Sequence, residues 1–127
     1  MRIAVITLPL LLLPGVVACG GGFPPPKDQW DAAKLDVAKA EGSVEEAARA
    51  AAGPSEGVAS AQAHLKVAQE DLGTAQPLIN DEPKRAASLI ELSKAEAQLA
   101  VSLAKQDLAQ RAAQKALSDL QKVKGGG

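Results

Sequence analysis

The sequence is almost free of aromatic residues, with one Phe, one Trp and no Tyr among 127 residues. It has one Cys and one His, too few for an internal disulfide or a His/Cys metal cluster. The net charge is −1 and no block of five like charges occurs, which argues against nucleic-acid binding. Motifs for a catalytic serine, a zinc protease or a nucleotide are absent as well, so we expect no enzyme, no cofactor and no metal site.

Alanine takes the place of the larger apolar residues and occurs 24 times between Ala32 and Ala116. Alanine is the best helix former, but it buries little area, so a core built from it is thin. We therefore predict an all-α fold, either an elongated antiparallel helical hairpin or a three-helix bundle with narrow, coiled-coil-like seams.

Residues 1–18 predict a signal peptide. Arg2 precedes an apolar run at residues 3–13, and small residues follow up to Cys19. A membrane-spanning helix needs about 20 mostly apolar residues, whereas this run is shorter and is interrupted by Pro9 and followed by Pro14. We therefore expect the leader to be cleaved in front of Cys19.

The four residues Val16-Val17-Ala18-Cys19 resemble the lipobox of bacterial lipoproteins, with Val16 in place of the more usual Leu. The resemblance implies that the Cys19 thiol carries a diacylglycerol and that the new amino terminus is acylated, for example with palmitate. Two or more acyl chains hold a protein stably on a membrane. Gly20 follows Cys19 where an Asp would favour the inner membrane, so the resemblance implies the periplasm-facing outer membrane.

Residues 19–27 predict the lipidated Cys19 and a Gly/Pro tether, because three glycines and three prolines surround Phe23. Such a tether reaches about 20–25 Å at most. A helical domain is expected over residues 28–124, with helices at about 28–52, 56–76 and 82–123, and residues 125–127 form a glycine tail. The first two helices share one 3-4 spacing of apolar residues, which fits a hairpin or one kinked rod.

The third predicted helix carries two apolar stripes. The first consists of Leu89, Leu92, Leu99, Leu103, Ala113, Leu117 and Leu120. The second consists of Ile90, Ala97, Val101, Ala104, Leu108 and Ala112. A helix with two stripes needs partners on two sides, either both earlier helices or one helix and a neighbouring chain. We expect the partner-binding residues in the second stripe, at Ile90, Ala97, Val101, Ala104 and Leu108.

From Val58 onward the chain resembles an alanine-rich bacterial envelope family, a domain of unknown function found in small lipoproteins and before OmpA-like domains. The matching positions are Val58, Ala61, Leu65, Ala68, Asp81, Glu82, Ala86, Leu89, Ala95, Glu96, Ala97, Leu99 and Ala100. Departures are Glu82-Pro83 in place of an Asp-Tyr turn, Glu96 in place of Asp, and a longer first connection. The resemblance implies an envelope role without an established chemistry.

Three single residues stand out from the pattern. His64 has no second His or Cys to complete a metal site and is expected at the edge of a seam. Glu96 interrupts the first stripe, where it lies at the stripe's edge or pairs with a Lys of a facing helix. Trp30 either caps the bundle core or meets lipid headgroups.

These observations predict a lipid-anchored envelope protein that acts as a spacer, scaffold or protein-docking module through helix–helix contacts. Its expected partners are the membrane, through Cys19, and either another protein or a second copy of the chain. One alternative is a peptidoglycan-associated stabiliser of the envelope, although Lys124 is followed here by three glycines rather than ending the chain as the wall-linked lysine does. A second alternative is a small-ligand carrier.

Overall fold

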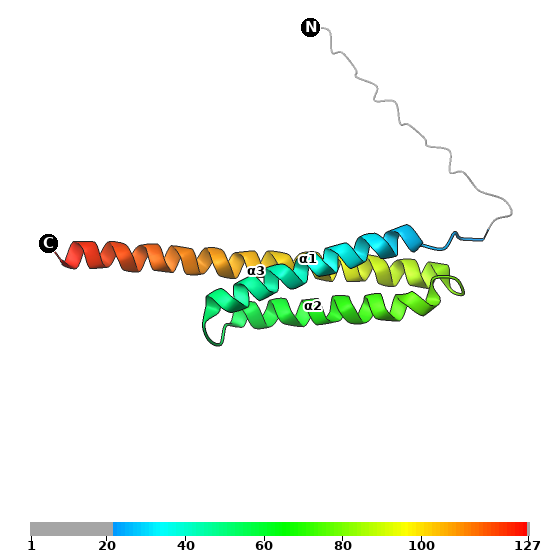
Figure 1. The fold of residues 1–127 in the computed structure, drawn as a ribbon, viewed down its shortest axis with the longest axis horizontal. Helices are drawn as coiled ribbons and strands as arrows, with labels where there is room; N and C mark the ends of the chain where they lie inside the picture. Colours follow the sequence, from blue (N-terminus) through cyan, green and yellow to red (C-terminus); the bar gives the residue numbers. More distant parts are fainter. Residues whose placement is uncertain (1–21, 127) are drawn as a thin grey trace, which may run out of the picture.

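The protein is an antiparallel bundle of three helices in a computed structural model that describes residues 22–126 (Figure 1). The helices are α1 at Lys27–Ala51, α2 at Glu56–Ala75 and α3 at Pro83–Gly125, with a short 3-10 turn, η1, at Gln76–Leu78. The chain reverses between α1 and α2 and again between α2 and α3, so α3 runs parallel to α1. The all-α prediction is confirmed, and each helix begins and ends close to its predicted bounds.

The connection between α1 and α2 is a tight reversal, so the two helices form a hairpin and not one kinked rod. Ala52 ends α1 in the left-handed conformation with φ 49°, and Gly53-Pro54 follows. Ser55 then caps α2, since its side chain accepts a hydrogen bond from the backbone N–H of Val58 at 3.3 Å. The apolar spacing continues in phase across this turn, but the turn residues decide the geometry.

The core is a narrow seam lined mainly by alanine and valine. On α3 the inward positions follow a strict 3-4 spacing and are at most 7% exposed: Ala86, Ile90, Ser93, Ala97, Ala100, Ala104 and Asp107. They face Ala33, Val37, Ala40, Val44 and Ala47 of α1, and Val58, Ala61, Ala68, Leu72 and Ala75 of α2. Small side chains let the helix backbones approach closely, so this line of small residues is the one that packs inside.

Polar contacts from Trp30 and Ser93 join α2 to both of its neighbours in the bundle. The Trp30 indole N–H of α1 donates to the Leu72 carbonyl of α2 at 3.3 Å, and the ring packs at the edge of the core. The Ser93 hydroxyl of α3 donates to the Ala68 carbonyl at 2.6 Å within the core. Trp30 therefore has the packing role considered above, and Ser93 satisfies its hydroxyl across the α2–α3 interface.

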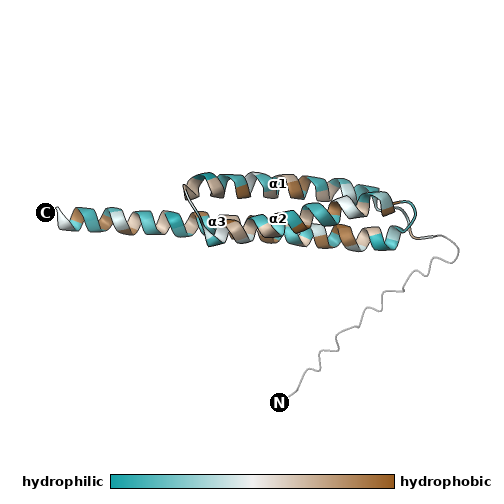
Figure 2. Ribbon diagram, turned by 90° about the horizontal axis from the view of Figure 1, so that it is seen from below, coloured by the Kyte–Doolittle hydropathy of each residue, from teal (hydrophilic) through white to brown (hydrophobic). Residues whose placement is uncertain are grey.

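The third helix is much longer than its neighbours, with 43 residues against 25 in α1 and 20 in α2. Its final segment, residues 112–125, extends beyond the α1–α2 turn, where no other helix of the described residues lies beside it (Figure 1). We call this segment the overhang. All of its side chains are exposed except Asp119, and Figure 2 shows apolar residues recurring along it. Among the described residues, none of the helices is apolar enough over a sufficient length to cross a membrane.

Candidate docking surface

The second stripe of α3 is covered by the chain's own helices as far as Leu108, while Ala112 lies exposed in the overhang. Ile90, Ala97 and Ala104 have no exposed surface, and Val101 and Leu108 are half-buried against the same core. Because α1 and α2 already pack on this stripe, the five residues expected to bind a partner hold the bundle together instead. Among these five residues, only Val101 and Leu108 keep exposed surface.

One part of that stripe borders open space. Ala97 and Val101 line a groove of about 600 Å³ between α1 and α3, where Gly42 and Ser43 of α1 leave room beside the helix. The helix continues through Gly42-Ser43 without a break. The remaining lining residues are Asp36, Lys39, Glu46, Gln98, Ser102 and Lys105. A groove with charges of both signs along its walls offers little continuous apolar area to a helix.

The first stripe is the one that faces outward. Four of its six leucines keep substantial exposed surface: 54% for Leu92, 42% for Leu99, 61% for Leu117 and 51% for Leu120. The other two, Leu89 and Leu103, are half-buried against the core. We name the complete 3-4 series on this face the outer seam. It consists of Leu92, Glu96, Leu99, Leu103, Gln106, Gln110, Ala113, Leu117, Leu120 and Lys124. The outer seam thus runs along the bundle and continues through the overhang.

The middle of the outer seam lies in a shallow groove beside α2. This groove has a volume of about 250 Å³, and its walls include Gly57 and Ser60 of α2 with Leu103, Gln106 and Gln110 of α3. Gly57 and Ser60 have small side chains, so a further helix could approach α3 along the groove, which Glu56 of α2 also lines.

An acidic cluster flanks the outer seam in the bundle. Glu96 Oε2 lies 2.5 Å from His64 Nδ1 of α2, so Glu96 pairs with a histidine and not with the lysine considered from the sequence. Burial raises the pKa of the neighbouring Asp71, and the Glu96 and Glu70 carboxylates raise it further. The face therefore combines exposed leucines with a local excess of negative charge.

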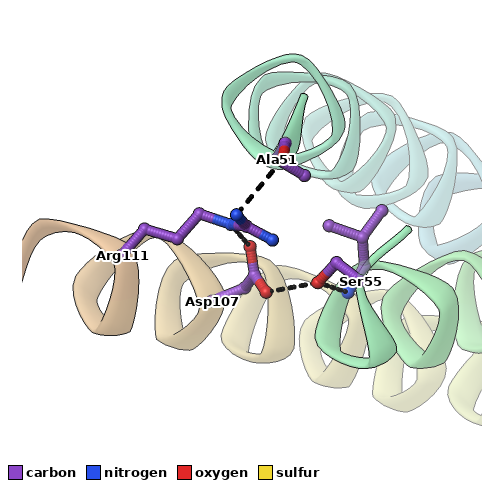
Figure 3. Close-up of polar contacts among 5 residues, drawn as sticks. Ala51, Ser55, Asp107 and Arg111 are labelled. Atoms are coloured by element: carbon purple, nitrogen blue, oxygen red, sulfur yellow. Dashed lines mark hydrogen bonds and ion pairs between the residues drawn. The ribbon is translucent and has the colours of Figure 1, made fainter. Parts of the chain in front are cut away.

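A network that we call the clasp marks the point where α3 leaves the bundle (Figure 3). Asp107, itself buried, accepts hydrogen bonds from the Ser55 hydroxyl at 2.6 Å and from Arg111 Nε at 2.7 Å. Arg111 Nη1 also donates to the Ala51 carbonyl at 3.3 Å, near the end of α1. The hydrogen bonds from Ser55 and Arg111 lower the pKa of Asp107. The clasp thereby ties α3 to both ends of the α1–α2 turn.

Gly57 makes room for the clasp. A Cβ at this position would lie 2.8 Å from Asp107 Oδ1, so no larger residue fits without a shift of the carboxylate. The sequence pattern alone did not single out Asp107. Two signals point to it: Asp107 continues the 3-4 spacing of the inward line after Ala104, and Arg111 follows at the i+4 position of a helix.

Beyond the clasp the inward side of α3 becomes polar, and the outer seam becomes the more apolar side. The inward line continues as Arg111, Gln114, Ser118 and Gln121, all polar, whereas the outer seam continues as Ala113, Leu117 and Leu120. The overhang also has three lysines and one aspartate, a net charge of +2, against ten basic and fourteen acidic residues, a net charge of −4, in residues 27–111. The overhang is a basic amphipathic helix attached to an acidic bundle.

Residues 22–126 contain no group of three or more His, Cys, Asp or Glu side chains that could hold a metal ion. Cys19 and the signal peptide predicted at residues 1–18 lie outside the described residues. Comparisons of the chain with protein-family models, curated proteins and solved structures find no match. The likeness to an alanine-rich envelope family therefore stays a prediction from the sequence.

Proposed function

We propose that the chain is a lipid-anchored cell-envelope protein that acts as a helical spacer and docking module. The observation that carries this proposal is the outer seam. Four of its five leucines are exposed, along a helix that extends past its own bundle. Monomeric proteins rarely expose large apolar patches, and such patches typically bind other proteins. We infer that docking takes place by helix–helix contact on this seam.

The arrangement of the ends supports the role of a spacer. Residues 22–26 enter α1 at the end of the bundle opposite the overhang (Figure 1). An anchor at Cys19 would therefore hold that end near the membrane, and the overhang would form the opposite end of the molecule. With 43 residues and a rise of 1.5 Å per residue, α3 spans about 64 Å.

The anchor is tested by mass spectrometry of the full chain expressed in a bacterium with a lipoprotein-processing pathway. The proposal predicts that the mature protein begins at Cys19 and carries diacylglycerol there. A Cys19→Ser variant should keep its leader and lose the acyl chains. An unmodified and uncleaved Cys19 in the otherwise native chain would contradict the anchor.

The docking role is tested by site-specific photo-crosslinking in cells. A photoreactive residue in place of Leu117, on the outer seam, should form discrete crosslinked products. The same residue in place of Ser118 points to the polar side of the overhang and serves as the matched control. If position 117 gives no product, or no more than position 118, the outer seam is not a docking surface.

A further inference from the structure

Resting on the proposed docking role, we infer that the partner on the outer seam is a second copy of this chain, paired antiparallel through α3. The twofold axis passes beside residue 108. Three independent features of the described residues support this pairing: the order of residues along the seam, the distribution of charge, and the length of the contact.

The outer seam matches itself when it is reversed about residue 108. Leu99 then lies opposite Leu117 of the second copy, Leu103 opposite Ala113, and Gln106 opposite Gln110. By symmetry each pair occurs twice. Between residues 99 and 117 the leucines meet leucine or the small alanine, and the amides meet each other at the centre, where a polar pair can hydrogen-bond and fix the register of two helices.

Two other alignments of the same seam are worse. A parallel pair would place Glu96 against Glu96 and Lys124 against Lys124, so like charges would meet at both ends. An antiparallel pair shifted by one heptad toward the amino terminus would place Gln110 and Gln106 against Leu99 and Leu103. Near the centre of the contact, these two amides would face leucine and lose their hydrogen-bonding partners, which costs free energy.

Charge favours the antiparallel pair for a second reason. It places each overhang, with a net charge of +2, along the bundle of the other copy, with a net charge of −4. At each end Lys124 lies opposite Leu92 and Glu96 opposite Leu120, so Lys124 and Glu96 of the two copies are neighbours one turn apart. The acidic cluster that includes Asp71 lies beside them. A parallel pair would instead bring the two acidic bundles together, as well as the two basic overhangs.

The length of the seam is sufficient for a stable dimer. The outer seam runs along α3 from Leu92 to Lys124. With two seam and two flanking positions per heptad, roughly 20 residues of each copy enter the contact, as in a standard protein–protein interface. The overhang alone is too short for this, and a helix of its length is marginal in water without a partner.

The pairing also determines how the dimer meets a membrane. The residues that lead into α1 leave opposite ends of an antiparallel dimer. Both copies can reach one membrane only if the dimer lies along its surface. The dimer would then act as a scaffold parallel to the membrane, with both anchors in the same leaflet.

Disulfide crosslinking between two differently tagged copies of the full chain, coexpressed in cells, tests the pairing. One copy carries Leu99→Cys and the other Leu117→Cys, so mild oxidation should join the two tags. Copies that both carry Leu99→Cys form the matched control and should not be joined, because those positions lie on opposite sides of the axis. Joining of two Leu99→Cys copies would show a parallel pair, and no joining of either combination would show no pair; each result overturns the inference.

A change of affinity separates this inference from the docking role in general. In the detergent-solubilised full chain, Leu117→Glu should raise the dimer dissociation constant about 100-fold, which corresponds to about 2.8 kcal/mol. Ser118→Glu should leave it within about threefold, and both variants should melt at the wild-type temperature when dilute. If the wild-type chain is monomeric while position 117 still crosslinks to a different protein in cells, the docking role stands and self-pairing is wrong.

Discussion

The two parts of α3 on either side of Arg111 share one helix and similar residues, but they differ in what surrounds them. In the bundle, the inward line of small residues is buried and the leucines of the outer seam lie at its flank. In the overhang, the corresponding inward positions are polar, and the outer seam is the apolar side that remains. The comparison teaches that the line of small residues forms the core, whereas the leucine face that the fold leaves uncovered is the candidate docking surface.

The largest expected effect comes from enlarging a residue of the inward line. Ala100→Leu should lower the free energy of unfolding by about 3 kcal/mol, because the fully buried Ala100 leaves no room for a larger side chain. In a domain of this size that is roughly 12–24 °C in Tm. The same substitution at the exposed Ala112 of the overhang should change Tm by less than about 3 °C. Thermal unfolding followed by circular dichroism measures the Tm of both variants. Equal losses of Tm would contradict the conclusion that Ala100 is tightly packed in the bundle while Ala112 of the overhang is not.

Smaller effects on stability, of opposite sign, are expected when two glycines of α2 are replaced by alanine. Gly73→Ala should stabilise the protein by about 0.5–1 kcal/mol, because a Cβ there meets nothing within 4 Å and alanine favours the helix. Gly57→Ala should destabilise it by about 1–2 kcal/mol, because the new Cβ displaces the Asp107 carboxylate and opens the clasp. Urea unfolding compares the two variants. If both variants are more stable than the wild type, the contact between Gly57 and Asp107 does not limit the size of residue 57.

The clasp should also make the stability of the protein depend on pH below about pH 4. The lowered pKa of Asp107 means that the folded state favours the ionised carboxylate. Its contribution is therefore present above the ordinary pKa of Asp, about 3.9, and is lost as the pH falls through the lower folded value. The slope of Tm against pH below about pH 4 should be shallower in Asp107→Asn than in the wild type. Asp119→Asn, in an exposed ion pair of the overhang, is the control and should keep the wild-type slope.

The smallest effect on stability is expected from the outer seam itself. Leu117→Ala should change the free energy of unfolding by less than about 0.5 kcal/mol in dilute, monomeric protein, because the Leu117 side chain is 61% exposed. Urea unfolding at low and high protein concentration tests this. The variant should differ from the wild type only at the higher concentration, where the wild type gains stability by pairing. A large loss at low concentration would show that Leu117 packs within its own chain.

The sequence predicts the three helices closely because their signals are local: the 3-4 spacing, Ser55 as a cap, and Pro54, Pro77 and Pro83 as interruptions. It does not predict which stripe of α3 lies inside. Leucine is more hydrophobic than alanine, so the pattern favours the leucine stripe for a core, whereas close approach of three helices favours the line of Ala97, Ala100 and Ala104. That choice depends on the distance between helices, which periodicity does not contain.

The clasp could not be predicted for a related reason. Asp107 and Arg111 share one turn of α3, whereas Ser55 lies far from both in the sequence, and only the hairpin brings it to them. The sequence left a hairpin and a kinked rod equally open. The position of the overhang, and with it the exposed end of the outer seam, depends on the direction of α2, which the sequence does not determine.

Hydrogen exchange of the backbone amides of α3, measured at two protein concentrations, tests the central claim most directly. The inward positions of residues 86–107 are buried within the bundle, so their amides should be protected at both concentrations. The amides of residues 112–124 should be protected at high concentration and exchange rapidly after dilution below the dimer dissociation constant, because the overhang is stabilised by the second copy. Protection of the overhang that is the same at both concentrations, whether high or low, would contradict the account.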